Sequence, residues 1–483
     1  MSILCQEYRA VRIGELRSVV IEGPSGIGKS YLVARFLDDL VPTVDGGRAD
    51  RARILAGRCY EQETMPYKAL DGAIDTLVRY LLTIAEPERQ ALLPDDAQFL
   101  ASLFPVLRQI PECRPGDVAA GSGPVEVRTR AVSALRLLME RMTEISPVIL
   151  HLEDLQWADR GSLELLSGLM AEPAPDGLMI LATVRSEHAG DERSATAGPV
   201  DLMPARFERR ITLGPLSEME QRELMTRLAS GSPLLDRVGE HLWRESGGHP
   251  MLLVEMARYA RAIPAQPVSL GSLVLEAVIG RRVSQLPENA RCLLQVIAVA
   301  GEPTPLAVLG RAIELSDNAR ERAAAVLRIE QLIRLVRAGE DPWLHTYHDK
   351  VQTAVLERLD PAWRRVMHGA LARALEDYGQ TAPATLARHW RAAGEPRKAG
   401  IYLVAAARSA ADTLAVDHAT RLFREALQLL PRVPIPPVAT ISPLRDSAAE
   451  QLDSGSRTRL DDDWNVARAR CHAMIGLAES LRV

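Results

Sequence analysis

The chain has 483 residues, of which 47% are apolar and only 4% are aromatic, so we expect roughly three or four domains with soluble, largely helical cores. A formal net charge of −5 excludes a global positive field that would attract nucleic acid, so nucleic acid is not an expected partner. The five cysteines lack C-x-x-C spacing, which excludes a zinc ribbon and favours a cytoplasmic protein, and the longest clean apolar run (residues 293–300) is too short to cross a membrane.

The stretch GPSGIGKS, residues 23–30, has the form of a phosphate-binding loop. It follows the apolar run SVVIEG, which predicts a buried strand, and it precedes KSYLVARFLDDL, which predicts a helix with one apolar face. Glycines let backbone N–H groups approach phosphates, and the helix N-terminus adds positive potential. Lys29 is expected to bridge the β- and γ-phosphates and Ser30 to ligate Mg²⁺. The predicted nucleotide-binding residues are Gly23, Pro24, Ser25, Gly26, Ile27, Gly28, Lys29 and Ser30.

A second acidic strand is predicted in residues 147–159, PVILHLEDLQWAD, with a helix from about Arg160. Glu153 stands where a nucleotide site has its metal-side carboxylate, so Ser30 and Glu153 are the predicted metal ligands. Asp154 stands where a catalytic base would orient water, although its carboxylate reaches about one methylene less far than that of a glutamate, which predicts slow hydrolysis. The alternative is a solvated acidic pair that ends a strand.

A further strand, residues 177–185, ends at Arg185. Because open α/β sheets present ligands at the carboxyl ends of their strands, Arg185 is a candidate sensor of the γ-phosphate and the third predicted catalytic residue. The alternative is an ion pair at a strand end. Residues 210–216 predict a last core strand, and Ser217 with Glu220 predicts a capping box for the next helix.

Taken in this order, GPSGIGKS, HLEDLQWAD and LATVR resemble the STAND class of AAA-related signal-transduction ATPases. Residues 245–255 resemble the family's G-x-P motif, which implies that Pro250 packs near the adenine. Residues 345–359 resemble its His-Asp segment, which implies that His348 meets the diphosphate of the resting state. Two departures stand out: only 22 residues precede the loop, without the V-G-R-E-like stretch of relatives, and the metal-side acid is Glu rather than Asp.

The resemblance implies ATP or ADP with Mg²⁺ as cofactors and a nucleotide-dependent homo-oligomer. Residues 57–77 resemble modules fused to bacterial Ser/Thr protein kinases and large transcription activators, which implies a kinase domain as partner in cis or in trans. The chain itself contains neither H-R-D nor D-F-G, so it is not expected to be a protein kinase.

The remaining sequence predicts mostly helices. Residues 60–146 are helical in pattern, with a loop at 114–124. Helices are expected at 286–301 and 323–333, followed by a hairpin at 334–348. Small or apolar residues at tetratricopeptide-repeat offsets follow in the C-terminal part, namely Ala407, Ala419, Phe423, Ala426 and Pro431. Residues 431–463 predict a loop or a disordered insertion, and the array is expected to be cut short.

The predicted fold class is an α/β P-loop NTPase with a parallel, AAA-like sheet, followed by a helical lid, a winged helix and α-solenoid hairpins. The expected domains are the NTPase core at 1–215, the lid at 216–262, the winged helix at 263–360 and the repeats at 361–483. The predicted function is an ATP-binding, slowly hydrolysing signalling switch whose repeats bind a protein partner. His348 as a plain core histidine, a hydrolysis-driven AAA motor and a DNA-binding regulator remain alternatives.

Overall fold

The computed structural model describes residues 1–40, 52–60, 66–114, 124–186, 207–229, 246–262, 275–337, 341–379, 381–431 and 454–481. The chain forms two compact units. The first comprises residues 1–63, 67–305 and 316–359, and the second comprises residues 64–66, 306–315 and 360–483. The division into four domains stays a prediction.

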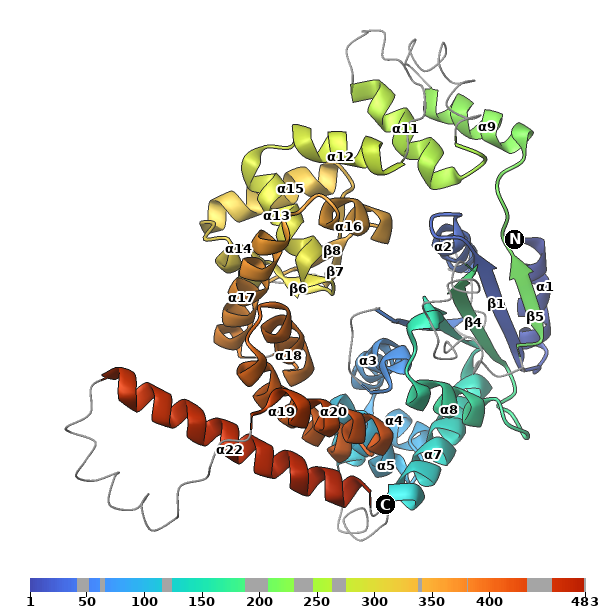
Figure 1. Cartoon of the computed structure of the whole chain (residues 1–483). Coiled ribbons are helices and arrows are strands. Elements are labelled where there is room, and N and C mark those ends of the chain that lie inside the picture. The colour runs from blue at the N-terminus through green and yellow to red at the C-terminus, as the bar shows by residue number, and fades with distance from the viewer. Residues whose placement is uncertain are drawn as a thin grey trace. The chain divides into compact units, whose positions relative to one another are not determined.

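A parallel sheet of five strands is the centre of the first unit, with the strand order β2-β3-β4-β1-β5 (Figure 1). Apart from the exposed edge strand β5 and part of β2, the strands are apolar runs buried on both faces, as parallel sheets require. Their carboxyl ends lie at one edge of the sheet. The strands are β1 (Arg17–Gly23), β2 (Arg53–Arg58), β3 (Val148–Glu153), β4 (Leu178–Arg185) and β5 (Arg209–Thr212).

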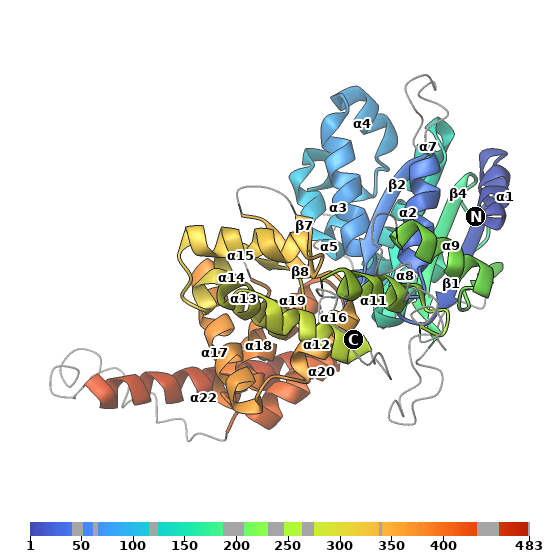
Figure 2. The ribbon, with the colours of Figure 1, turned by 90° about the horizontal axis from the view of Figure 1, so that it is seen from above.

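Helices cover both faces of this sheet. Helices α1 (Ser2–Arg12) and α2 (Lys29–Leu40) pack on one face, where their apolar side chains meet alternate residues of β1, β3 and β4 in a single core. Helices α3 (Lys68–Thr83) and α7 (Pro124–Ile145) pack on β2 and β3 and lie on the other side from α1 (Figure 2). The first unit therefore has the three layers of a P-loop α/β domain.

The first unit continues in further helices and a small antiparallel sheet of order β6-β8-β7. Its remaining elements are α4 (Glu86–Leu92), α5 (Ala97–Leu103), η2 (Pro105–Gln109), η3 (Pro111–Cys113), η4 (Leu155–Trp157), α8 (Arg160–Leu169), α9 (Glu218–Ala229), α11 (Pro250–Ala262), α12 (Leu275–Gln285), α13 (Glu288–Ala300), β6 (Thr304–Pro305), α15 (Asp317–Ile329), β7 (Ile333–Arg337), β8 (Trp343–Thr346) and α16 (Asp349–Leu356).

The second unit is helical throughout its described residues. Neighbouring helices share one apolar core, which includes Ala407 and, from the next helix, Ala419, Phe423 and Ala426. These positions are buried, as the repeat spacing predicts. The helices are α14 (Leu306–Ala312), α17 (Pro361–Tyr378), α18 (Pro383–Ala392), α19 (Pro396–Asp412), α20 (Val416–Leu429) and α22 (Ser454–Ser480).

The predicted strands at 18–23, 147–153 and 177–185 and the helices after them are present. The capping box is confirmed, since the Ser217 backbone N–H donates to Glu220 Oε2 at 2.8 Å. Two expectations were wrong in detail: the helix expected at 323–333 ends at Ile329, and residues 454–463 belong to α22 rather than to a loop. Strand β2 was missed. A helix that has already formed gains one backbone hydrogen bond for each residue added to its end, even when that residue is polar. Composition alone therefore does not show where such a helix begins or ends. The predicted loop residues 115–123 and 432–453 lie outside the described residues.

Candidate functional site

The loop between β1 and α2 forms the first part of the candidate site. Gly26 and Gly28 have φ angles of +83° and +105°, which glycine adopts without steric cost. Helix α2 begins at Lys29, so its first N–H groups lie directly at the loop. The Lys29 Nζ donates to the carbonyl oxygens of Gly23 at 2.7 Å and Pro24 at 2.9 Å. The ammonium group is therefore held against the phosphate-binding loop itself.

The two predicted metal ligands lie next to each other. Ser30, in the first turn of α2, donates its hydroxyl hydrogen to Glu153 Oε1 at the end of β3. The other carboxylate oxygen of Glu153 accepts from Arg58 Nη1 at 2.9 Å. Among the residues that the structure describes, no group of three or more His, Cys, Asp or Glu side chains could hold a metal ion. A hydroxyl and one carboxylate nevertheless fit Mg²⁺, which keeps several waters and takes oxygens from phosphates.

Asp154 is buried, and four residues contact it. Its Oδ2 lies 2.9 Å from Arg58 Nη2, and its Oδ1 lies 3.4 Å from Arg185 Nε. Gln156 Nε2 donates to the same Oδ1 at 3.3 Å, and the Asp154 backbone N–H donates to Thr183 Oγ1 at 3.0 Å. Burial alone would raise the pKa of Asp154, but Arg58 and Arg185 together with the Gln156 bond hold that pKa below its ordinary value. The carboxylate is therefore ionised and fully engaged.

Arg185 connects the sheet edge to helix α16. Its guanidinium contacts Asp154 on one side and donates through Nη2 to Asp349 on the other. Its backbone N–H donates to Gln156 Oε1 at 3.2 Å, which fixes the end of β4 beside the acidic residues. Arg185 therefore forms the strand-end ion pair that the sequence left open as the alternative to a sensor.

His348 precedes α16 and caps it. Its Nδ1 accepts from the Lys350 backbone N–H at 3.2 Å. Burial, followed by the nearby charge of Arg185, lowers the pKa of His348 to about 3. The ring is therefore neutral at pH 7. Because Nδ1 accepts, the proton of the neutral ring lies on Nε2, which makes that nitrogen a hydrogen-bond donor.

The G-x-P segment packs on the phosphate-binding loop. Gly248 has a φ angle of +81°, and its carbonyl oxygen accepts from the Leu216 backbone N–H at 2.8 Å. Pro250 is the first residue of α11, a position that suits its fixed φ angle. A Cβ atom added to Gly26 would lie 2.8 Å from His249 Cε1 and 2.9 Å from Met251 Sδ. Any side chain at Gly26 would therefore force the side chains of His249 and Met251 to move.

Sequence reasoning missed several residues of this site. Arg58 contacts both acidic residues, Gln156 joins Asp154 to the end of β4, and Asp349 pairs with Arg185. Arg58 lies opposite Glu153 in the register of β2 and β3, but nothing local marked β2 as a strand. Asp349 lies in the predicted His-Asp segment, so the resemblance of that segment was the one signal that could have marked Asp349 as a site residue.

Residues 1–181 match the family model described as an AAA ATPase domain. A Signal Transduction ATPase with Numerous Domains (STAND) that carries a tetratricopeptide repeat sensor, from Pyrococcus horikoshii, has a similar structure, with a TM-score of 0.50 and 14% identity over 99% of this chain and 66% of that chain. Residues 1–181 thus match an AAA ATPase domain, and the fold of the chain is similar to that of this STAND protein, in agreement with the resemblance that the motifs indicated.

Two further proteins are similar to this chain. An uncharacterised protein of Rhizobium meliloti (strain 1021) is 23% identical over 459 residues, which cover 89% of this chain and 42% of that protein. A Walker-type ATPase of Pyrococcus abyssi has a TM-score of 0.32 and 16% identity over 73% of this chain and 95% of that chain, too distant to add to the argument. The chain thus spans less than half of the bacterial relative and about two thirds of the P. horikoshii protein.

None of the described helices has both the length and the apolar character that crossing a bilayer requires.

Proposed function

We propose that the first unit binds ATP and ADP with Mg²⁺ and acts as a nucleotide-dependent switch with slow hydrolysis. In this proposal the backbone N–H groups of residues 23–30 and the Lys29 ammonium bind the phosphates. Ser30 and Glu153 hold Mg²⁺, which would neutralise charge on the phosphate oxygens. The contact between their side chains supports this assignment, because it brings a hydroxyl and a carboxylate oxygen together beside the first turn of α2.

One observation carries the switch: a continuous chain of charges runs from the acidic end of β3 to helix α16. Asp154 contacts Arg185, and Arg185 contacts Asp349 at the start of α16. A γ-phosphate beside Lys29 would offer Arg185 a more highly charged partner than Asp349. Arg185 would then leave Asp349, and the contact between α16 and the sheet edge would be lost.

His348 is the complementary element for the diphosphate state. Its neutral ring carries an N–H donor on Nε2. The ring lies close enough to Arg185 for the positive charge of Arg185 to lower the pKa of His348. An uncharged N–H donor can form a hydrogen bond with a diphosphate. A charged imidazolium would in addition repel the positively charged arginines nearby, and the neutral ring avoids this repulsion. We therefore assign to His348 the role of retaining ADP, and to Pro250 a place near the adenine.

The environment of Asp154 supports slow hydrolysis. A base that orients water needs a free carboxylate oxygen within hydrogen-bond reach of that water. Here one oxygen is shared by Arg185 and Gln156, and the other contacts Arg58. Hydrolysis therefore requires these contacts to rearrange first. We expect turnover well below the ~10 s⁻¹ that is the median for enzymes.

The energies are sufficient for a switch. Moving an equilibrium from 1:99 to 99:1 takes about 5.5 kcal/mol of differential binding. Each hydrogen bond to a charged group contributes about 1.5–3 kcal/mol. Two or three contacts that exist in only one state, made by Arg185 and His348 among others, supply that amount.

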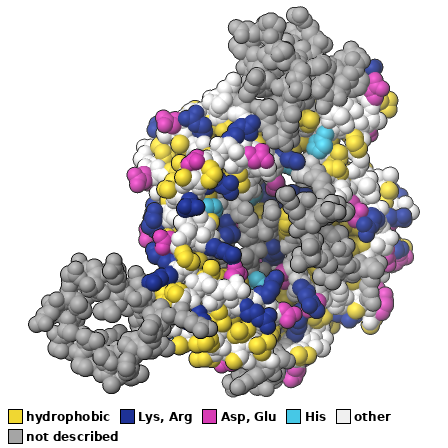
Figure 3. Space-filling model, in the orientation of Figure 1, with side chains coloured by type: hydrophobic (Ala, Val, Ile, Leu, Met, Phe, Trp, Pro, Cys, Tyr) yellow, Lys and Arg dark blue, Asp and Glu magenta, His cyan; other side chains and the backbone are white. Residues whose placement is uncertain are grey.

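The other parts of the chain have roles in the same proposal. Residues 216–262 would form the lid, residues 263–360 a winged helix and residues 361–483 the repeats that bind a protein partner. A nucleotide-dependent homo-oligomer, a Ser/Thr kinase domain as partner and a place in bacterial signalling are further parts of it. On the face presented in Figure 3, basic and acidic side chains both occur across the described surface, which gives no support to a DNA-binding role.

The proposal is tested by nucleotide exchange on His348→Ala, with His472→Ala in the second unit as the matched control. Loss of one charge-assisted bond should speed the release of a fluorescent ADP analogue by about 10- to 150-fold. ATP affinity should change much less, and the control should release ADP like the wild type. Equal loss of affinity for ADP and ATP would make His348 merely structural and remove the proposed diphosphate contact. Fast steady-state turnover of the wild type would favour a motor instead.

A further inference from the structure

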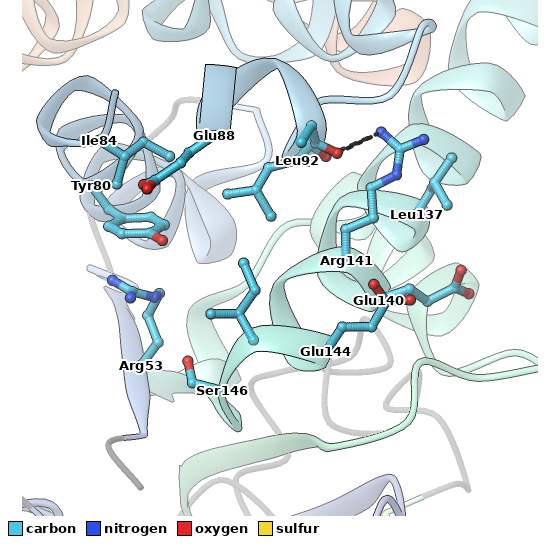
Figure 4. Close-up of a pocket in the computed structure, with 12 residues that line it drawn as sticks. Arg53, Tyr80, Ile84, Glu88, Leu92, Leu137, Glu140, Arg141, Glu144 and Ser146 are labelled. Atoms are coloured by element: carbon cyan, nitrogen blue, oxygen red, sulfur yellow. Dashed lines mark hydrogen bonds between the residues drawn. The ribbon is translucent and has the colours of Figure 1, made fainter. Parts of the chain in front are cut away.

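The first unit contains a cavity of about 790 Å³ at the amino ends of β2 and β3 (Figure 4). Arg53 begins β2, and Ser146 lies two residues before β3. Helices α3, α4 and α7 supply the rest of the lining. The cavity is therefore at the opposite edge of the sheet from the candidate nucleotide site, and its volume lies in the range of small-molecule sites.

Apolar side chains line part of this cavity although they are accessible to solvent. Leu137 and Ile145 on α7 are 38% and 52% exposed. Ile84 after α3 and Leu92 on α4 line the cavity as well. Apolar surface in a concave site loses contact with water when an apolar group binds there, which favours binding by the hydrophobic effect.

Carboxylates supply the charge that is not balanced locally. Glu88, Glu140 and Glu144 line the cavity, and none of them forms an ion pair with any of the residues described. The two arginines of the lining contact other groups than these carboxylates. The Arg53 guanidinium lies 3.4 Å from the Tyr80 ring centroid. Arg141, in turn, donates through Nη1 to carbonyl oxygens at the end of α4, at 3.3 Å for Ala91 and 2.7 Å for Leu93.

A buried hydroxyl completes the lining. The Ser146 side chain is only 4% exposed, and its Oγ has no hydrogen-bond partner among the described residues. Figure 4 shows this hydroxyl directed into the cavity, between Arg53 and the end of α7. Buried polar groups are nearly always paired, so an unpaired hydroxyl in a cavity wall points to a polar group that binds there.

We propose that this cavity is a second binding site, which takes a small organic cation with an apolar body. The ammonium or guanidinium group lies beside the carboxylates of Glu140 and Glu144, and the apolar body covers Leu137 and Ile145. Ser146 offers its hydroxyl oxygen to a donor of the ligand. This binding does not depend on the nucleotide site, so it can be tested whether or not the proposed switch is correct.

The test uses the full chain and three probes of similar shape: 3-phenylpropylammonium, neutral 3-phenylpropanol and 3-phenylpropionate. Calorimetry should give saturable binding of the cation, weaker binding of the alcohol and no binding of the anion. The double variant Glu140→Gln/Glu144→Gln should weaken cation binding about 5- to 30-fold, as expected from two partly exposed charge contacts.

The matched control is Glu321→Gln/Glu357→Gln, which removes two exposed glutamates of α15 and the end of α16, outside the cavity. It should bind the cation like the wild type. Ile145→Ala adds a second readout, because it should weaken the binding of the cation and the binding of the alcohol by a similar factor. The proposal is overturned if the cation does not bind saturably, if the anion binds as well as the cation, or if both double variants have the same effect.

Discussion

Replacing Asp349 by Asn tests the charge chain from which the switch was inferred. The change keeps the shape of the side chain and removes the negative charge that Arg185 contacts. The two side chains are 13% and 31% exposed, for Arg185 and Asp349 respectively. A hydrogen bond between charged groups contributes about 1.5–3 kcal/mol, and the partial exposure of Asp349 favours the lower end. A loss of about 1.5 kcal/mol corresponds to about tenfold in an equilibrium constant.

We therefore expect Asp349→Asn to weaken the binding of ADP about tenfold relative to the binding of ATP. The reason is that the contact between Arg185 and Asp349 belongs to the state in which α16 lies at the sheet edge. The assay is competitive displacement of a fluorescent nucleotide by ADP and by ATP, from which the ratio of dissociation constants follows. Asp377→Asn is the control, because its ion pair with Arg311 is 3.5 Å long and both side chains are mostly exposed.

A double-mutant cycle assigns the effect to this contact. In the Arg185→Gln background, Asp349→Asn should have no further effect on the ADP-to-ATP ratio, because its partner is already gone. If the ratio of folded Asp349→Asn stays within about twofold of the wild type, which is less than 0.5 kcal/mol, the charge chain does not couple α16 to the nucleotide.

Three further predictions follow from the same geometry. First, the wild type should bind ATP more tightly with Mg²⁺ than with EDTA, and Ser30→Ala and Glu153→Gln should each remove most of this difference in affinity. An unchanged difference would place the metal elsewhere. Second, burial lowers the pKa of His345 to about 4 and that of His348 to about 3, so both stay neutral in the folded state while the unfolded chain binds protons below about pH 6.5. Stability should therefore fall as pH falls, by about 2 kcal/mol for each histidine between pH 7 and pH 5, and urea unfolding of His348→Gln should show a smaller loss over this range; an equal loss would contradict the lowered pKa. Third, if β2 and β3 transmit occupancy of the second cavity, saturating 3-phenylpropylammonium should change ADP affinity about fivefold or more, and ADP should change the affinity of the cation by the same factor. Unchanged ADP affinity at full occupancy would mean that the two sites are independent.

The parts that could be predicted from the sequence are those whose signal is local. The phosphate-binding loop combines an apolar strand, a fixed glycine spacing and a helix within about 20 residues, and β3 ends at Glu153, which Asp154 follows directly. In the structure, the loop and β3 both lie at the residues that the sequence predicted. The proximity of Ser30 and Glu153 also follows from the motifs, because parallel strands end at one edge of the sheet.

The missed parts depend on contacts between distant residues. Strand β2 has the sequence RILAGR, whose alanine, glycine and two arginines give little strand signal. Gly57 is there because α3 packs closely: a Cβ atom would lie 2.6 Å from the Ala69 carbonyl oxygen. Without β2, Arg58 could not be aligned with Glu153. Similarly, Arg185 and Asp349 are 164 residues apart, so only the fold shows that they pair.

Nucleotide binding at the loop that Lys29 contacts is the central claim, and calorimetry with Mg²⁺-ATP tests it most directly. The wild-type chain should bind Mg²⁺-ATP saturably with one site. Lys29→Ala should lose that binding, while Lys398→Ala, which removes a lysine stacked on Trp390 in the second unit, should keep it. Near-normal affinity in Lys29→Ala would contradict the account.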